Sequence, residues 1–117
     1  MKPSRHVLLI DLADDAQAIA QYEAWHAAGA VPSAISASIR GAGIEAMEIY
    51  RTGNRLVMIM EAAADFDPER KAAADAADPA VQAWEATMDR VQRPLPWALD
   101  GSKWTPAELI YSLADQA

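Results

Sequence analysis

Cysteine is absent from all 117 positions of this sequence. Its absence excludes disulfide bonds, thiolate nucleophiles and cysteine-bound zinc or iron–sulfur centres. The two histidines, His6 and His26, stand far apart among scattered carboxylates, which is not the spacing of a metal-binding motif. Glycine-rich phosphate loops and the serine-centred motif of hydrolases are also missing. We therefore expect a protein that works without a metal ion or any other cofactor.

Long apolar runs and an excess of positive charge are likewise missing. The apolar run near the start, residues 7–10, is too short for the core of a signal peptide or for a membrane span, so we expect a cytoplasmic protein. The formal charge is -7 at pH 7, and the isoelectric point is near 4.6. This balance repels phosphate backbones and anionic lipid. The sequence therefore argues against a nucleic acid or a membrane as a partner.

The chain does contain enough apolar sequence for one modest core. Hydrophobic residues make up 52% of it, and no repeat, low-complexity tract or linker divides it. We therefore expect a single domain over residues 1–117. A core of this size gives only marginal stability to an isolated domain, and a dimer would add to it.

Apolar periodicity and turn residues predict the order of the elements. Residues 44–51 and 55–61 are predicted strands, joined by a tight turn at Thr52-Gly53-Asn54. Asp67-Pro68 and Asp78-Pro79 each place a helix cap before a proline that fits a first helical turn. The other predicted elements are a strand at 6–12, a helix at 14–28 capped by Asp14, a helix from about residue 32 to Gly41, a loop at 94–102 and a last strand at 107–113.

This order predicts an α+β fold of the ferredoxin-like, split βαβ type, in which helices cover one face of an antiparallel sheet. In the strand at 55–61, Leu56, Met58 and Met60 alternate with Val57 and Ile59, so both faces of that strand are apolar. The face without helices needs a cover, and a second copy of the same sheet is the simplest one. We therefore predict a homodimer that forms a dimeric α/β barrel.

The stretch from Tyr22 to His26 carries the strongest catalytic candidates. On a helix these two residues lie one turn apart, so the phenol and the imidazole project from the same inward face as Ile19. An imidazole with a pKa of ~6.5 suits proton transfer near pH 7. The alternative is a structural histidine bonded to a backbone carbonyl, with the tyrosine packed in the core and bonded outward.

Trp84 and Glu85 are the second candidate pair. An indole packs against the C–H face of a sugar, and a neighbouring carboxylate accepts hydrogen bonds from its hydroxyl groups. The alternative is that Trp84 is the largest residue of an apolar helix stripe shared with Val81, Met88 and Val91. Met47 and the methionines of the second hairpin strand could line an apolar pocket wall, although core filling explains them more simply.

In order along the chain, these residues form a pattern that resembles the L-rhamnose/L-fucose mutarotase family. The pattern covers nearly the whole chain, and no single motif in it is diagnostic. It consists of Tyr22-x-x-x-His26, Pro32, Gly43-Ile44, Ile49-Tyr50, Asn54-x-Leu56, Glu61 and Asp78-x-x-Val81-x-x-Trp84-x-x-x-Met88.

The resemblance implies a cofactor-free, dimeric enzyme that interconverts the α and β anomers of 6-deoxy-sugar pyranoses. It implies that His26 is the catalytic proton donor, that Tyr22 contacts the sugar, and that Trp84 is the first of a tryptophan pair lining the site. Glu85 stands where the second tryptophan is expected, and Met47 where a tyrosine binds rhamnose. Val31 also replaces a tryptophan, with one extra residue between His26 and Pro32. These departures favour L-fucose as substrate, with Glu85 as base or hydroxyl anchor.

Two other functions fit the same fold. Small cofactor-independent monooxygenases and haem-degrading enzymes also place an inward histidine in a split βαβ dimer, and there His26 would ligate haem or orient a polycyclic substrate. A non-enzymatic, small-molecule-binding dimer would use the same pair structurally. A haemin titration would separate these possibilities, since a mutarotase stays colourless and accelerates anomer exchange.

Overall fold

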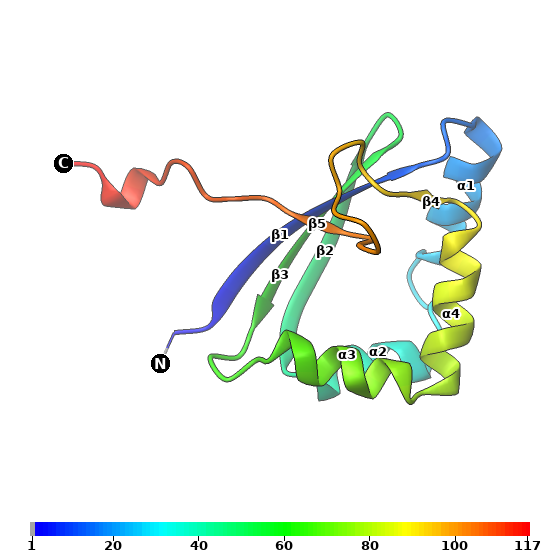
Figure 1. Ribbon diagram of the computed structural model, residues 1–117, viewed down its shortest axis with the longest axis horizontal. Helices are drawn as coiled ribbons and strands as arrows, with labels where there is room; N and C mark the ends of the chain where they lie inside the picture. The colour runs from blue at the N-terminus through cyan, green and yellow to red at the C-terminus, as the bar shows by residue number, and fades with distance from the viewer. Residues whose placement is uncertain (1) are drawn as a thin grey trace.

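The computed structural model describes residues 2–117 and contains one five-stranded antiparallel sheet (Figure 1). Its main path runs in the order β2-β3-β1-β4. Strand β5 pairs with the same edge of β1 as β4 does, at an earlier stretch of β1. The strands are β1 (Ser4–Leu12), β2 (Ile44–Thr52), β3 (Arg55–Ala62), β4 (Gln92–Arg93) and β5 (Thr105–Pro106). Strand β3 therefore lies between β1 and β2, which confirms the predicted split βαβ arrangement.

Four α-helices lie on one side of this sheet (Figure 1). Between β1 and β2 the chain forms α1 (Ala16–Trp25) and α2 (Ser33–Gly41), and after β3 it forms α3 (Pro68–Ala76) and α4 (Pro79–Asp89). The two predicted Asp-Pro starts are confirmed, because each aspartate side chain accepts the backbone N–H of the residue two positions later. None of the helices in residues 2–117 is long and apolar enough to cross a membrane.

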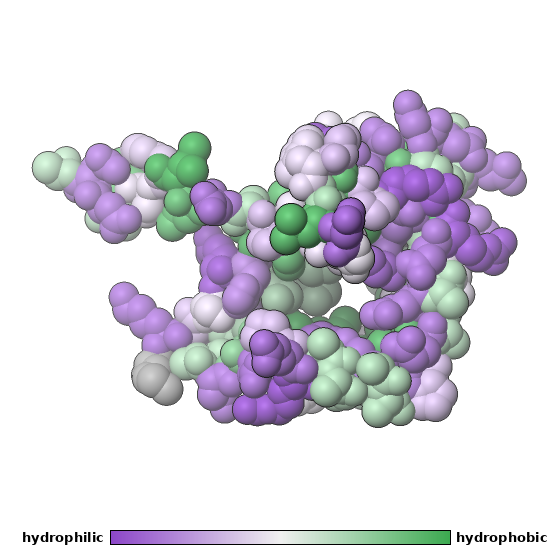
Figure 2. Space-filling view, in the orientation of Figure 1, coloured by the Kyte–Doolittle hydropathy of each residue, from purple (hydrophilic) through white to green (hydrophobic). Residues whose placement is uncertain are grey.

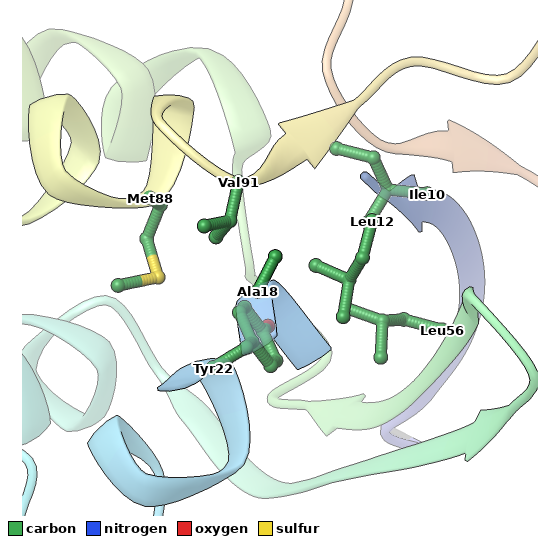
Figure 3. Packing of buried hydrophobic residues seen from close by; sticks show 7 residues of the cluster. All are labelled: Ile10, Leu12, Ala18, Tyr22, Leu56, Met88 and Val91. Carbon is green, nitrogen blue, oxygen red and sulfur yellow. The ribbon is translucent and has the colours of Figure 1, made fainter. Parts of the chain in front are cut away.

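The core lies between the sheet and the pair α1 and α4. Figure 3 shows Tyr22 and Ala18 of α1 between sheet residues on one side and residues at the end of α4 on the other. The sheet contributes Ile10, Leu12 and Leu56, each at most 1% exposed. Tyr22 is 3% exposed, so burial of this core fixes the position of its ring.

The first helix is shorter than predicted at both ends. Its cap is Asp15 instead of Asp14, and it ends at Trp25, three residues before Ala28. At the end, the backbone N–H of His26 bonds the oxygen of Glu23, and its imidazole Nδ1 bonds the oxygen of Tyr22 at 2.8 Å. In a continuing α-helix the Tyr22 carbonyl would accept the backbone N–H of His26. Here it bonds the imidazole of the same residue instead, and His26 therefore ends the helix.

The predicted last strand at 107–113 is wrong. In this part of the chain only Thr105–Pro106, strand β5, pairs with β1, and the ladder ends with one further bond, from the backbone N–H of Ala107 to the oxygen of Val7. Beyond it the chain leaves the body as an arm, residues 107–117, with Ile110 93% exposed (Figure 1). The alternation in this segment is real, but no strand of the described chain lies beside it. The edge strand that continues the sheet is β4, which is only two residues long.

Candidate active site

A cavity of about 650 Å³ opens between the helices and the sheet. Its volume is within the usual range for sites that bind small molecules. Figure 2 shows the hollow beside the segment that precedes β5, with apolar side chains inside it. All of the residues that sequence reasoning selected for the site line this one cavity, namely Tyr22, His26, Met47, Trp84 and Glu85.

Among the lining residues that were not predicted are Gln92, Lys103 and Trp104. Gln92 lies in the two-residue strand β4, which is too short to show periodicity. Lys103 and Trp104 precede β5 in a loop whose path depends on tertiary contacts, including an ion pair of 2.7 Å between Lys103 Nζ and Asp89 Oδ1 of α4. No sequence signal available before folding separates these residues from ordinary loop residues.

The rings of Tyr22 and His26 are stacked, with centroids 4.0 Å apart and planes inclined by 26°. A carbonyl oxygen only accepts hydrogen bonds, so the bond between His26 Nδ1 and the Tyr22 oxygen requires a proton on Nδ1. In a neutral imidazole the other nitrogen, Nε2, then carries a free lone pair. The backbone-bonded histidine of the alternative interpretation is therefore present, yet the same bond leaves Nε2 able to accept a proton.

Burial controls the charge of His26. The ring is half-buried, and the loss of solvent lowers its pKa below the ordinary 6.5, while the bond to the Tyr22 carbonyl acts in the opposite direction and is the smaller effect. At pH 7 the imidazole is therefore mostly neutral. It is ready to accept a proton from a ligand and to return it later.

Burial shifts the pKa of Tyr22 in the opposite direction. Burial raises its pKa from 10.0 to about 12, and the polar side chain of Gln92 opposes part of that rise. The phenol therefore keeps its proton across the physiological range. Both residues line the same cavity, so its wall combines a residue that can accept a proton with one that keeps its own, the two functions that general acid–base chemistry uses.

Trp84 brings α4 into the site. Its ring meets the His26 ring edge-on, with centroids 5.3 Å apart and planes at 66°. Trp84 packs against the apolar core and also lines the cavity, so the core interpretation and the binding interpretation both describe it. The next residue, Glu85, is half-buried at the same cavity. This contact places an indole against the imidazole, and a carboxyl group lines the same cavity.

The methionines have a similar double role. Met60 is a core residue of a second apolar cluster, against which Met47 and Met58 pack, and all three line the cavity. Within residues 2–117, no three histidine, aspartate or glutamate side chains are grouped so that they could hold a metal ion.

Known proteins resemble this chain both in sequence and in fold. A profile of the L-rhamnose mutarotase family matches residues 5–113. The chain is 48% identical over 115 residues to an L-fucose mutarotase of Xanthomonas campestris pv. campestris, covering 98% of this chain and 92% of that protein. It is 30% identical over 108 residues to a UPF0734 protein of Dictyostelium discoideum, covering 89% and 85%. The crystal structure of an L-rhamnose mutarotase from Formosa agariphila shares the fold, with a TM-score of 0.64 at 18% identity over 94% of this chain and 98% of that one.

Proposed function

This chain belongs to the L-rhamnose mutarotase family and is a sugar mutarotase, an isomerase, and we propose that it interconverts the α and β anomers of L-fucose by acid–base ring opening. One observation supports the assignment of chemistry to residues. His26, with its free Nε2, and the protonated phenol of Tyr22 line the same cavity as Trp84. The family match favours this function over haem degradation or simple binding, and no feature of the site favours either alternative.

The proposed reaction begins with opening of the hemiacetal. Nε2 of His26 takes the proton of the anomeric hydroxyl while the bond between C1 and the ring oxygen breaks. The ring oxygen receives the proton of the Tyr22 hydroxyl. Each proton transfer of this kind contributes ~10²–10⁴-fold. The product is an open aldehyde, held between an imidazolium and a phenolate.

Closure returns both protons. After rotation about the C1–C2 bond, the hydroxyl oxygen attacks the other face of the aldehyde, and its proton goes back to Tyr22. The imidazolium of His26 gives its proton to the carbonyl oxygen, which becomes the new anomeric hydroxyl. His26 thus acts as the proton donor that the resemblance implies, but in the closing half of the reaction, because its lowered pKa makes it neutral at the start.

The remaining site residues hold the sugar. The indole of Trp84 packs against its C–H face, Glu85 accepts hydrogen bonds from its hydroxyl groups, and Met47 forms an apolar wall for the 6-methyl group. L-Fucose is favoured over L-rhamnose for two reasons: the relative that is 48% identical is named for L-fucose, and Met47 and Glu85 replace aromatic residues expected for rhamnose.

Anomer exchange measured by NMR tests the substrate assignment. Saturation of one anomeric proton is transferred to the other at the rate of interconversion, and this is compared with and without the protein for L-fucose, L-rhamnose and D-galactose. We expect the largest acceleration for L-fucose and a smaller one for L-rhamnose. Acceleration of L-rhamnose alone would overturn the assignment of L-fucose, and acceleration of none of the three would overturn the assignment to deoxy-sugars.

We also propose that the protein forms a homodimer through the sheet face opposite the helices. The register places two apolar cross-strand pairs on that face, Val7 with Ile59 and Leu9 with Val57. Ion pairs flank this apolar centre at both ends, Arg5 with Glu61 at 3.0 Å and Arg55 with Asp11 at 2.7 Å. An apolar centre with a charged rim is typical of protein interfaces.

The arm supports the same proposal. Its apolar side chains are mostly exposed, and the arm runs away from the body of its own chain (Figure 1). A large exposed apolar surface is typical of an association site, and a second copy would cover it together with the sheet face.

The cytoplasmic location expected from the sequence stays a prediction, which the position of a fluorescent fusion would test.

A further inference from the structure

Lys71 and Asp75 of α3 form an ion pair in the wall of the cavity. Lys71 Nζ lies 2.6 Å from Asp75 Oδ2, and the two side chains are only 22% and 16% exposed. Each of the other four ion pairs within residues 2–117 has at least one side chain that is 38% exposed or more. The pair of Lys71 and Asp75 is therefore the most buried of the five, and it borders the same cavity as His26 and Trp84.

Three helices hold this ion pair in place. The hydroxyl group of Ser38, on α2, donates to Asp75 Oδ1 at 3.1 Å. The side-chain amide of Gln82, near the start of α4, donates to the backbone oxygen of Asp75 at 2.9 Å. Lys71 itself lies one turn before Asp75 on α3. Side chains fixed in this way are preorganised for a ligand, because little conformational freedom remains to be lost on binding.

Ser38, Lys71 and Asp75, here called the polar cluster, all line the cavity and have hydrogen-bonding capacity that the protein does not use. An ammonium group has three N–H donors, and a carboxylate has about four acceptor sites. Within residues 2–117, Lys71 Nζ bonds one acceptor, and each carboxylate oxygen of Asp75 accepts one bond. A buried ion pair adds little stability by itself, and unmet hydrogen-bonding capacity makes it more costly. Hydroxyl groups of a ligand would supply both the missing acceptors and the missing donors.

The polar cluster and Tyr22 lie at different ends of α4. Gln82, which bonds Asp75, is near the start of this helix, and Met88, near its end, belongs to the core cluster of Tyr22. Figure 1 likewise shows α3 at the start of α4 and α1 near its end. Six residues of an α-helix span about 9 Å. One pyranose with a hydrogen bond on each side can bridge a distance of this size, and Trp84 lines the cavity in between.

We propose that the polar cluster binds the hydroxyl groups at C3 and C4 of the sugar and thereby helps to select the substrate. The inference rests on the proposed mutarotase function, in which the anomeric hydroxyl and the ring oxygen meet His26 and Tyr22. In a pyranose the C3–C4 bond lies directly opposite the bond between C1 and the ring oxygen. A sugar with one edge at His26 and Tyr22 therefore turns its 3- and 4-hydroxyl groups toward the start of α4. There Lys71 donates to these hydroxyl groups and Asp75 accepts from them, in hydrogen bonds that charge strengthens.

Substitution of Lys71 tests this role. Lys71→Met keeps the length of the side chain and removes the charge, and we expect it to raise KM for L-fucose by about 10- to 100-fold, the loss of a hydrogen bond to a charged group. The value of kcat should change less, because the polar cluster takes part in no proton transfer. Lys71 borders both the cavity and a smaller hollow of about 290 Å³, whereas Arg70 borders the smaller hollow alone. Arg70→Met is therefore the matched control and should keep the wild-type KM. An unchanged KM in folded Lys71→Met would overturn the proposal.

Deoxy analogues separate direct contact from a structural effect. If Lys71 binds the sugar at C3 or C4, the increase in KM caused by Lys71→Met should be smaller for an L-fucose analogue that lacks the 3- or the 4-hydroxyl group. A general distortion of the cavity would raise KM equally for all three sugars. The same increase with L-fucose and with both analogues would therefore contradict direct binding by the polar cluster.

A titration followed by NMR depends neither on activity nor on a substitution. In a ¹H–¹⁵N spectrum of the wild type, the backbone amide resonances of Ser38, Lys71 and Asp75 should shift when L-fucose is added, while that of Arg5 on β1 should not. Unchanged resonances of the polar cluster would overturn the proposal, whether or not those of Trp84 shift. Failure of the wild type to accelerate any sugar would instead overturn the proposed function, and the titration would still decide whether the polar cluster binds sugar. It also decides the case in which Lys71→Met does not fold.

Discussion

The imidazole of His26 donates a hydrogen bond from Nδ1 to the main-chain oxygen of Tyr22, four residues earlier, at a distance of 2.8 Å. This bond ends helix α1 and fixes the tautomer of the imidazole at the same time. Because the acceptor belongs to the backbone of the helix, the position of the ring depends on burial of Tyr22 in the core. The geometry of the proton acceptor is therefore a consequence of the fold of the first helix.

The pH dependence of the reaction follows from the direction of the His26 pKa. Burial lowers that pKa below 6.5, and only the neutral ring can accept the anomeric proton. We expect kcat/KM for L-fucose to increase with pH through the His26 pKa and to level off before neutrality. It should stay level well below the Tyr22 pKa of about 12. Exchange rates measured by NMR between pH 5 and 8, corrected for spontaneous mutarotation, would check this. A rate that decreases with increasing pH would mean that His26 must start protonated.

Substrate preference should depend on the two positions that differ from the rhamnose pattern. Met47→Tyr combined with Glu85→Trp restores the aromatic residues that the resemblance associates with rhamnose. We expect the ratio of L-rhamnose to L-fucose activity to increase by roughly tenfold. Glu69→Trp on the exposed surface of α3 is the control and should leave the ratio unchanged. An unchanged ratio in the double variant would show that these two side chains do not select the sugar.

Much of this site could be predicted from the sequence because its residues lie on long, regular elements. The spacing of Tyr22 and His26 and the stripe that contains Trp84 are local signals, and these three residues line one cavity. The capped start of α4 is a local signal as well, and the bond from the Ala80 N–H to Asp78 confirms it. Local signals did not reveal where α1 ends, since that depends on a side chain that competes with the backbone for a carbonyl. They also did not reveal Gln92, whose burial is set by pairing with a distant strand.

The predicted strand at 107–113 shows a second limit. Alternating apolar residues predict a strand only if a partner strand lies beside it, and beyond Ala107 no strand of the described chain does. Apolar periodicity indicates which face of a segment can be buried. It does not indicate whether the surface that covers this face belongs to the same chain.

The homodimer proposal predicts the state of association in solution. Wild-type protein should have the mass of a dimer by light scattering at micromolar concentration. Val57→Glu places a charge in the apolar centre of the open sheet face and should yield a monomer, since an unpaired buried charge is costly. The control, Ala72→Glu, adds the same charge on the exposed surface of α3 and should stay dimeric. A monomeric wild type would overturn the proposal.

Stability should depend on the core beneath the site. Leu56 is 1% exposed on β3, an interior strand of the sheet, so Leu56→Ala should lower the free energy of unfolding by about 2–5 kcal/mol through lost burial and a cavity. Leu99 is 80% exposed, and Leu99→Ala should change the free energy of unfolding by less than about 0.5 kcal/mol. Urea unfolding of both variants at one protein concentration would check this difference. Similar values for the two variants would contradict the described core.

The most direct test of the mechanism is saturation transfer between the two anomeric protons of L-fucose in the presence of His26→Ala. The other histidine supplies the control, since His6 lies on β1, bonds Ser4 and meets the ring of Phe66. Removal of the proton acceptor should abolish most of the acceleration, a loss of ~10²–10⁴-fold, while His6→Ala keeps it. Full saturation transfer by folded His26→Ala would contradict the central role given to this imidazole.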